Sequence, residues 1–446
     1  MSCSPKFKVA ICGAGIGGLT TAIALAQYPD IEVDIYEGAA KLAEVGAGLG
    51  VWPRPWEVLK RLGLEDELLK YTDLRPSEKP VPCFRYRKSD CPEGVDFYTL
   101  VTKGPLILLH RPDFQNALLR KLPHSYRVHC SKRLRSYSQR PGGPVTLLFE
   151  DETQATCDVL VGADGIKSAV RRSFLHEKAQ WAQGEGKLSE AADIMDMIEP
   201  SWSGTVAYRA VIPGDQLRAR DPNHNIFRQP TQYIGRTGHI IAYPMAHGKM
   251  INLVAFTSRH ELEGTKFNGP WVCPTEKQEF LAAFRNWEPE VQALLDCIDK
   301  PLRWSIHTIK PLGSFVSGHV SIIGDAAHAM TPHQGSGAGQ AVEDAFILAT
   351  VLGHPNTVKA NIPYALSVYD QIRRPHALSV QERSRLNGLY FTLQPPGFDL
   401  NKLPKDELLP KLKALGRLIY SNWDWAWTSS MGSSVQEAVQ LLDASS

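Results

Sequence analysis

The residues whose spacing most directly suggests chemistry are three glycines near the start of the chain. Gly13, Gly15 and Gly18 form the pattern Gly-x-Gly-x-x-Gly directly after an apolar run at residues 7–12. In such a turn the first glycine lets the chain reverse, the second lets a pyrophosphate approach the backbone, and the third lets a helix pack closely on a strand. The unpaired N–H groups at the helix start then face the anion. The predicted chemistry is phosphate binding.

The elements around these glycines are those that a dinucleotide site requires. Residues 7–12 have strand composition, residues 19–26 have helical spacing, and a second strand at residues 31–36 ends at Glu37. A carboxylate at this place can accept hydrogen bonds from both ribose hydroxyls and would repel a 2′-phosphate. The pattern therefore predicts the adenosine of FAD or NAD rather than that of NADP.

A second glycine-rich segment before a helix lies far along the chain. An apolar run at residues 320–325 ends in Asp325, and glycines at 335, 337 and 339 precede a helix predicted at about residues 341–352. The N–H groups and the dipole of such a helix start attract an anion or the electron-rich edge of a ring. Two glycine-rich helix starts in one chain suit a long ligand with two ends.

Three other places allow both a functional and a purely structural interpretation. The glycines at 46, 48 and 50 could lie close to a flat ligand or form a simple connector. Arg111 precedes the proline that opens a helix, where it is either solvated or within reach of an anionic cofactor. A strand predicted at residues 155–161 leads into a turn containing Asp164, which either lies beside a ligand or has only a local role.

Composition gives no indication of nucleic acid, a membrane or a metal. The 446 residues carry 49 basic and 47 acidic side chains, so the net charge of +2 leaves no large electrostatic bias. No apolar run is long enough for a membrane helix, and the first strand follows Met1 too closely for a signal peptide. The eight cysteines form no CxxC pair, and His328 and His333 have no acidic partner at metal-ligand spacing. We expect a cytoplasmic protein, monomer or homodimer, in which both histidines lie in loops.

The rest of the chain divides into β-rich and helical stretches. We expect short strands within residues 76–104 and an exposed insertion with a helix at residues 177–200. Strand composition returns at 204–212, 240–244 and 250–257, and two amphipathic helices follow at about 275–297. A long helix is predicted at about 360–390, and a tail with three tryptophans should pack back onto the body.

Three motifs in this order resemble the signature set of the single-component FAD-dependent aromatic hydroxylases. They are the first glycine turn with Glu37, the turn at residues 162–165 with Ser168 and Arg171, and residues 324–328 with Pro332, Gly335 and Gly337. The chain is most similar to the salicylate hydroxylase-like branch, which includes fungal enzymes that act on phenolic acids and aldehydes. The similarity extends over about residues 7–390.

This resemblance implies an α/β fold with an α+β substrate region. A Rossmann-type FAD-binding domain would comprise residues 1–75, 105–176 and 301–355. An inserted β-sheet substrate domain would comprise residues 76–104 and 177–300, and residues 356–446 would form a C-terminal helical segment.

The resemblance also assigns roles to individual residues. Arg209 and Tyr243 match the arginine and tyrosine that hold the substrate phenolate in the fungal relatives, so they are the predicted catalytic residues, and Pro332 completes the substrate site. The implied FAD contacts are Gly13, Gly15, Gly18, Glu37, Gly50, Arg111, Asp164, Asp325, Gly337 and Ala338. The chain departs from the family pattern at Pro53-Arg54-Pro55 and at residues 335–339, where Ser336 and Gly339 replace glutamine and asparagine.

The implied reaction is hydroxylation of a phenolic acid of the salicylate or 4-hydroxybenzoate type, alkylated or not. NADH or NADPH would bind transiently and reduce FAD, and the reduced flavin would capture O₂ as a C4a-hydroperoxide. Attack on a carbon that carries a carboxylate would release CO₂. Arg209 and Tyr243 would favour the phenolate over the phenol. Two other classes share the first turn: an FAD or NAD dehydrogenase without oxygen chemistry, and a non-enzymatic regulator similar to GDP-dissociation inhibitors.

Overall fold

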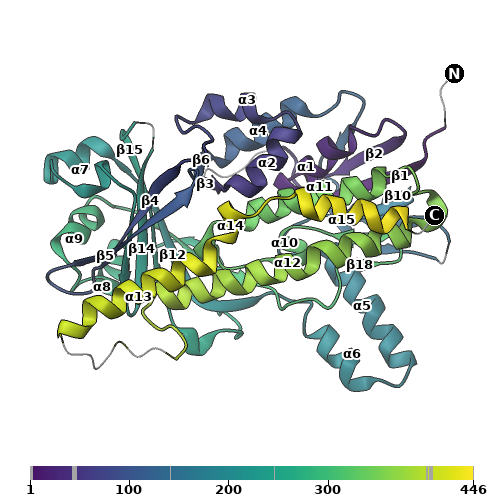
Figure 1. Cartoon of the computed structure of the whole chain (residues 1–446). Coiled ribbons are helices and arrows are strands. Elements are labelled where there is room, and N and C mark those ends of the chain that lie inside the picture. Colours follow the sequence, from purple (N-terminus) through teal and green to yellow (C-terminus); the bar gives the residue numbers. More distant parts are fainter. Residues whose placement is uncertain are drawn as a thin grey trace.

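Two large sheets and the helices that pack on them make up the molecule. The computed structural model describes residues 4–42, 48–140, 142–245, 247–397, 400 and 405–444. One sheet has six strands and the other eight, and the long helix α12 (Ile362–Phe391) runs past both parts of the molecule (Figure 1). The predicted α/β class with a separate β-rich region is confirmed.

The six-stranded sheet brings the three sequence motifs to one edge. Its order is β18-β19-β11-β1-β2-β7, and all neighbours are parallel except β18 and β19. Because β1, β11 and β19 are adjacent and parallel, the turns that follow their carboxyl ends lie side by side, as ligand-binding turns of such sheets do. The strands are β1 (Phe7–Cys12), β2 (Ile31–Tyr36), β7 (Arg127–His129), β11 (Val159–Gly162), β18 (Val316–Ser317) and β19 (Val320–Ile322).

The strand predicted at residues 155–161 is in fact two strands of different sheets. β10 (Gln154–Cys157) pairs antiparallel with β9 (Val145–Phe149), which also pairs with β8 (Leu134–Ser138), whereas β11 joins the six-stranded sheet. The change occurs at Asp158, whose carboxylate accepts a hydrogen bond from the N–H of Lys8 at 2.9 Å. The two strands differ in burial: β11 is fully buried, whereas Gln154 and Thr156 of β10 are exposed.

The eight-stranded sheet has the order β16-β17-β12-β15-β14-β13-β4-β5. Helices cover one of its faces with buried aromatic and aliphatic side chains such as Phe280, Phe284 and Leu294. Residues 76–104 contribute two nine-residue strands rather than the short ones expected. The strands are β4 (Pro80–Lys88), β5 (Val95–Lys103), β12 (Ser201–Pro213), β13 (Thr231–Gly235), β14 (Gly238–Met245), β15 (Met250–Ser258), β16 (Val272–Pro274) and β17 (Leu302–Thr308); the covering helices are α7 (Gly214–Arg220), α8 (Lys277–Ala283) and α9 (Pro289–Asp296).

The remaining helices surround the six-stranded sheet or project from it. The second helix start lies at Gly337, four residues before the predicted position, so Gly337 and Gly339 lie in the first helical turn and only Gly335 precedes it. A short ribbon of β3 (Gly48–Val51) and β6 (Ile107–His110) lies between the two large sheets. The helices here are α1 (Ile16–Leu25), α2 (Pro53–Arg61), α3 (Glu65–Leu68), α4 (Arg111–Lys121), α10 (Asp325–His328) and α11 (Gly337–Gly353).

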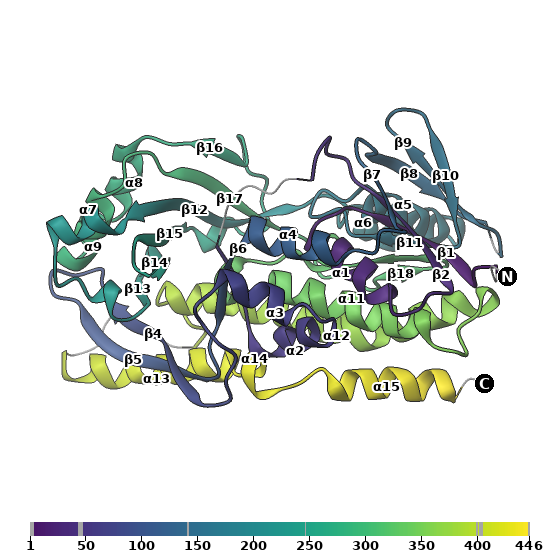
Figure 2. The same ribbon diagram turned by 90° about the horizontal axis from the view of Figure 1, so that it is seen from above.

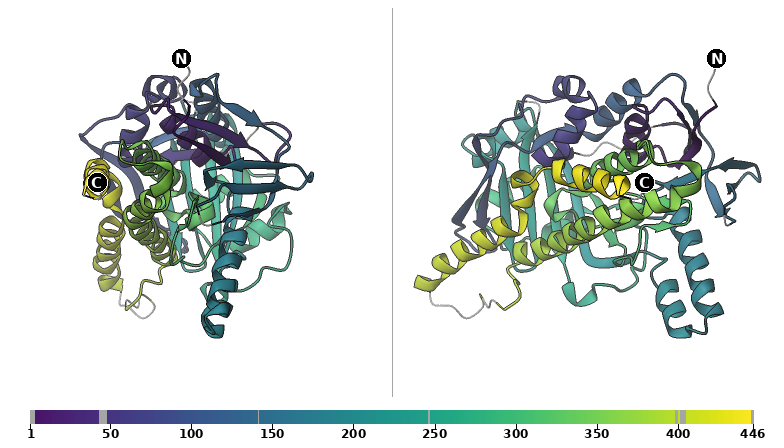
Figure 3. Two further views of the ribbon diagram at one scale, coloured as in Figure 1. Left: turned by 90° about the vertical axis from the view of Figure 1, so that its right-hand side faces the viewer. Right: turned by 45° about the vertical axis from the view of Figure 1, so that its right-hand side comes forward.

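The insertion expected at residues 177–200 is a helical hairpin that projects from the body (Figure 3). Its helices are α5 (Ala169–Gly184) and α6 (Leu188–Met195). At the other end of the chain, α13 (Lys405–Trp423), α14 (Trp425–Thr428) and α15 (Gly432–Asp443) run back along one side of the molecule (Figure 2). Across the described ranges, no helix combines the length and the apolar composition needed to cross a lipid bilayer.

The two departures from the family pattern contact each other. Pro55 in α2 packs over Gly339 in α11, and a Cβ atom at Gly339 would lie only 2.8 Å from Cγ of Pro55. Arg54 is buried, pairs with Glu343 of α11 at 3.2 Å, and donates a 2.7 Å hydrogen bond to the carbonyl of Ser430. The altered residues therefore join α2 to α11 and to the C-terminal segment, which is a packing role.

This contact predicts an unusual effect for a glycine replacement within a helix. Gly339→Ala should lower the free energy of unfolding by about 1–3 kcal/mol, since the rigid ring of Pro55 cannot move aside, although alanine otherwise favours a helix by about 1 kcal/mol. Denaturant unfolding of the single variants and of the Pro55→Ala/Gly339→Ala double variant measures this. The double variant should recover most of the loss; equal losses in both backgrounds would contradict the contact.

Candidate active site

The first glycine turn has the local geometry that its sequence predicted. Gly13 has a φ of +104°, and a Cβ atom there would lie 2.3 Å from the carbonyl oxygen of Ala163. A Cβ atom at Gly18 would lie 1.9 Å from the carbonyl oxygen of Gly13, because helix and strand are so close. A Cβ atom at Gly15 would meet no atom within 4 Å. Gly13 and Gly18 thus serve the fold, and Gly15 leaves open space where a ligand can approach.

A channel of about 1500 Å³ begins at this turn and runs between the two large sheets. Gly15 and Glu37 line it at one end, and the eight-stranded sheet lines it at the other. Both oxygens of Glu37 accept backbone hydrogen bonds at 2.8 Å, one from the N–H of Ala14 and one from that of Ala39. Glu37 therefore holds the glycine turn in shape in addition to facing the channel where a ribose is predicted.

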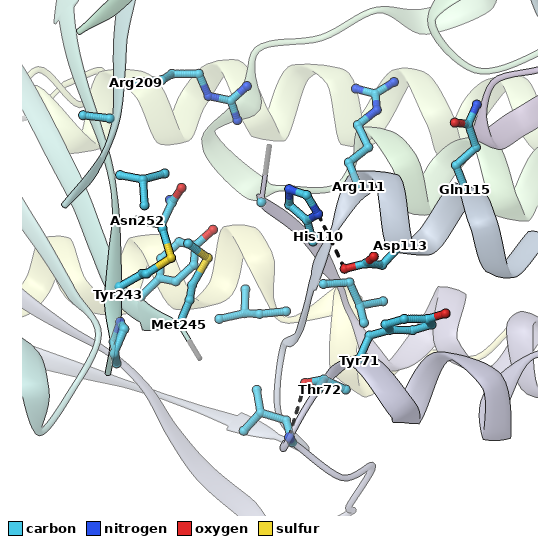
Figure 4. A pocket seen from close by; sticks show the side chains of 18 of the residues that line it. Tyr71, Thr72, His110, Arg111, Asp113, Gln115, Arg209, Tyr243, Met245 and Asn252 are labelled. Carbon is cyan, nitrogen blue, oxygen red and sulfur yellow. Dashed lines mark hydrogen bonds and ion pairs between the residues drawn. The ribbon is translucent and has the colours of Figure 1, made fainter. Parts of the chain in front are cut away.

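Opposite walls of the channel carry arginines (Figure 4). Arg111 comes from the first turn of α4, beside Gln115, whose amide donates to the carbonyl of Ala14 at 3.3 Å. Arg209 comes from β12 on the facing sheet, together with Tyr243 of β14. The structure places both predicted catalytic residues and Arg111 around one channel, which spacing along the chain did not establish.

The guanidinium group of Arg209 is largely buried and makes no hydrogen bond to the part of the chain that the structure describes. Its carbon lies 5.7 Å from the centre of the Trp304 ring. Burial lowers the pKa of Arg209. The charge of Arg111 lowers this pKa further, whereas Tyr243 raises it. An arginine nevertheless stays protonated at neutral pH. A buried cation with free donors is a suitable partner for an anionic group of a ligand.

Tyr243 is a neutral hydrogen-bond donor at this place. Its side chain is 8% exposed, and its hydroxyl lies against Gly48, where a Cβ atom would be 2.4 Å away. Burial raises the pKa of Tyr243 to about 12, although Arg209 and the Asn252 side chain act in the opposite direction. The phenol therefore keeps its proton near pH 7.

A second cavity of about 230 Å³ adjoins the channel at Arg209 and Tyr243. Alternate residues of β14 and β15 form one wall, because successive side chains of a strand point to opposite faces. Pro332 and His333, from the short 3₁₀ turn η4 (Pro332–Gln334), close the cavity on another side. The wall residues are His239, Ile241 and Tyr243 from β14, and Asn252, Val254 and Phe256 from β15.

Several residues of this cavity were not identified from the sequence. Gln232, His239, Asn252 and Trp304 line it, and His333, which was expected to be a loop histidine, does so from η4. The sequence signal for His239 is the alternation of side chains along a strand, which puts residues 239, 241 and 243 on the same face. That signal is useful only once the strand limits and the buried face are known.

Other predicted cofactor residues have more varied surroundings. Asp164 caps α5: its carboxylate accepts from the N–H groups of Ala169 at 2.8 Å and Val170 at 3.1 Å, and burial raises its pKa. Gly50 in β3 lines the smaller cavity and backs onto the Leu106 side chain. Of the glycine-rich stretch proposed at residues 46–50, positions 46 and 47 lie outside the described residues.

The second glycine-rich helix start is open in the same way as the first. Asp325 is exposed at the start of α10, and Gly337 and Ala338 occupy the first turn of α11, where Ser336 makes no side-chain cap. A Cβ atom at Gly335 or Gly337 would meet no atom within 4 Å. The free N–H groups and the open space suit the predicted ligand end.

A buried ionic network supports this second turn. Asp344 of α11 accepts from the N–H of Gly324 at 2.9 Å, contacts Nε2 of His328 at 2.5 Å, and pairs with Arg373 of α12 at 2.8 Å. Burial would raise the pKa of the Asp344 carboxyl, but His328 and Arg373 outweigh it and hold that pKa well below its usual range. His328 is therefore not a loop histidine: it belongs to α10 and holds the turn in place from within the core.

The residues present fit a dinucleotide with a reactive far end. Two uncapped helix starts offer N–H groups, Gly15 and Gly337 leave room for a ligand, and the channel adjoins a small cavity that the cationic Arg209 lines. This arrangement defines a nucleotide-dependent oxidoreductase that holds a small substrate next to the far end of its cofactor.

Comparison with known proteins agrees with this class. Residues 6–216 and 300–384 match the family model described as FAD binding domain. The chain is 36% identical to a salicylate hydroxylase of Pseudomonas putida, covering 97% of this chain and 94% of the relative, and 34% identical to an FAD-dependent monooxygenase of Strobilurus tenacellus, covering 99% of both. A solved structure titled as a salicylate hydroxylase substrate complex superposes with a TM-score of 0.82 at 32% identity, over 98% of each chain.

The chain belongs to the FAD-dependent aromatic hydroxylases, the family of the salicylate hydroxylases and related FAD-dependent monooxygenases. It is therefore an enzyme that binds FAD and takes electrons from NADH or NADPH. The dehydrogenase and the non-enzymatic regulator considered from the sequence are set aside by this membership.

The open space at Gly15 predicts a variant that loses FAD without losing its fold. Gly15→Val should weaken FAD binding about 10- to 100-fold, the equivalent of the 1–3 kcal/mol that overpacking costs, because its Cβ atom enters open space where no protein atom lies within 4 Å. Fluorescence titration with FAD and unfolding of the apoprotein measure the two effects. Gly18→Ala is the contrasting variant, since its methyl group would meet the backbone and destabilise the apoprotein itself. Unchanged FAD affinity in Gly15→Val would remove this turn as the pyrophosphate site.

Proposed function

We propose that this enzyme hydroxylates a phenolic acid whose phenolate oxygen binds between Arg209 and Tyr243. The single observation that supports this assignment is the guanidinium group of Arg209: it is largely buried, without a hydrogen-bond partner among the described residues, and placed where the cofactor channel meets the small cavity. A buried charge without a partner is costly, and an anionic ligand removes that cost.

Each residue has a distinct part in this proposal. FAD, when bound and reduced, supplies the activated oxygen that is added to the aromatic ring. Arg209 lowers the pKa of the bound phenol by stabilising its anion, and the phenolate makes the ring richer in electrons. Tyr243 donates its O–H to the same oxygen, since its own pKa of about 12 keeps it protonated. The apolar side chains of the cavity, among them Ile241 and Val254, exclude water.

The substrate type follows from the size and polarity of the small cavity. A volume of about 230 Å³ suits a compound with a single aromatic ring and short substituents. Salicylate- and 4-hydroxybenzoate-like acids, with or without an alkyl group, meet this description, and two of the relatives above are named for salicylate or for FAD-dependent monooxygenation. If the attacked carbon carries the carboxylate, CO₂ leaves and the net reaction is oxidative decarboxylation.

A panel of hydroxybenzoates and their alkylated relatives tests the proposal. Substrate-dependent consumption of NADH or NADPH and of O₂, with a product heavier by one oxygen atom or lighter by the exchange of a carboxylate for a hydroxyl, is the expected result. NAD(P)H oxidation that continues without O₂ would favour a dehydrogenase instead. A purified protein without flavin absorbance would contradict the cofactor assignment as well.

A further inference from the structure

The end of the small cavity that lies away from Arg209 carries its own polar groups. Along β14 the cavity-facing residues are Tyr243, Ile241 and His239, in that order. Four residues of a strand span about 13 Å, which leaves room for a substituted aromatic ring with a hydrogen bond at each end. On the antiparallel strand β15, Asn252, Val254 and Phe256 stand opposite these three residues, so His239 supplies the polar group of the far end. The wall is thus polar at both ends and aliphatic between them.

A neighbouring strand holds His239 in one orientation. Nδ1 of His239 lies 2.7 Å from Nε2 of Gln232 on β13, and the imidazole ring stacks on Phe256 with ring centres 4.5 Å apart. With the amide N–H₂ of Gln232 directed at Nδ1, the ring proton is assigned to Nε2. The side chain is 1% exposed, and Nε2 has no hydrogen-bond partner among the described residues. A buried N–H of this kind is costly unless something occupies the cavity and accepts its hydrogen bond.

The far end of the cavity is uncharged. Burial, together with His333 and His260, holds the pKa of His239 well below its usual range, and burial lowers the pKa of His333 to about 3. Of the described residues that line this cavity, Arg209 alone carries a permanent charge. A carboxylate next to His239 would be buried without a counter-charge, whereas a neutral oxygen would satisfy the free N–H.

We propose that His239, oriented by Gln232, is a specificity-determining residue that donates a hydrogen bond to an uncharged oxygen substituent, a carbonyl or a hydroxyl, on the far side of the substrate ring from Arg209. This inference rests on the proposed function, because it places the phenolate oxygen at Arg209 and Tyr243. It narrows the substrate to a phenol with a neutral polar group, rather than a carboxylate, on the far side of the ring, and so disfavours the 4-hydroxybenzoate type.

Two probes of nearly equal shape test this inference: a resorcinol with an acetyl group and its ethyl analogue. Their affinities are measured by quenching of intrinsic tryptophan fluorescence, because Trp304 and Trp423 line the cavity, and their KM values by NAD(P)H consumption. We expect the wild type to bind the acetyl compound about tenfold more tightly, the effect of one buried hydrogen bond. His239→Phe keeps an aromatic ring against Phe256 and should abolish that preference by weakening only the acetyl compound. Gln232→Leu leaves the imidazole in place and should reduce the preference in part.

The outcomes separate the inference from the proposed function. An unchanged acetyl preference in both His239→Phe and Gln232→Leu would overturn the role of His239, and so would equal binding of the two probes by the wild type. Because binding is measured without turnover, a wild type that prefers the acetyl compound but hydroxylates neither probe would contradict only the proposed function. Hydroxylation of both probes with equal KM would contradict only the inference.

Discussion

Arg209→Ala should leave the protein yellow and nearly inactive. The variant loses the permanent charge that Arg209 alone supplies among the described residues lining the cavity, so the bound phenol is no longer held as its anion and the ring is less reactive. Removing one partner of a buried charge pair typically costs about 2–5 kcal/mol, which corresponds to a fall in kcat/KM of about 30-fold to several thousand-fold. Steady-state kinetics with the best substrate of the panel, together with the flavin absorbance of the purified protein, measure the two quantities.

Two further variants make this result specific. Arg209→Lys keeps a positive charge but loses the planar fork of donors, so its kcat/KM should fall between those of the wild type and the alanine variant. Arg303→Ala removes an arginine from the adjacent strand β17, where it pairs with Glu279 at 3.3 Å outside both cavities, and should change kcat/KM little. If Arg209→Ala turned over substrate at the wild-type rate, Arg209 would have no part in the reaction.

Asp344→Asn should have the largest effect on stability. The carboxylate is fully buried and serves Arg373, His328 and the N–H of Gly324 at once, so its replacement leaves buried donors without an acceptor. Breaking a buried pair in this way costs about 3–5 kcal/mol. Denaturant unfolding at one fixed FAD concentration measures the loss. Glu382→Gln, which weakens an exposed pair with Arg385 on α12, is the matched control and should stay within about 0.5 kcal/mol of the wild type.

The difference in the free energy of unfolding between the wild type and Asp344→Asn should depend on pH in a defined direction. The pKa of Asp344 is lower in the folded protein than its value of about 4 in the unfolded chain, so its charge stabilises the fold at all higher pH values. That contribution decreases as the pH falls below about 4, towards the folded pKa. The part of the free-energy gap between the wild type and Asp344→Asn that is due to the Asp344 charge should therefore narrow as the pH falls below about 4. A gap that widens on acidification would contradict the assignment.

The positions that local backbone geometry determines were predictable from the sequence. Gly13, Gly15 and Gly18 each meet a requirement set within a few residues: a positive φ, an absent Cβ beside open space, or close packing of a helix on its own strand. The strands and helices next to these glycines were also predictable, because short stretches of sequence indicate them. The resemblance to a family added Arg209 and Tyr243, and in the structure both residues line the channel and the small cavity.

Pairings between distant segments were not predictable in this way. Asp158 divides one apolar run between two sheets, and Pro55 packs on Gly339 from the other end of the cofactor-binding part. These contacts depend on which surfaces meet after folding, and the composition along the chain does not predict which surfaces meet.

The sequence by itself determined the class of cofactor and the family of the enzyme, and it predicts the place of the pyrophosphate, because phosphate binding is set by the backbone of one short turn. Only the tertiary structure decided what surrounds the substrate. It placed His239 and Gln232 at the far end of the cavity, and it joined Asp344 to His328 and Arg373 beneath the second turn. Burial and charge pairing arise from contacts between segments far apart in the chain, so these features exist only after the sheets and helices have come together.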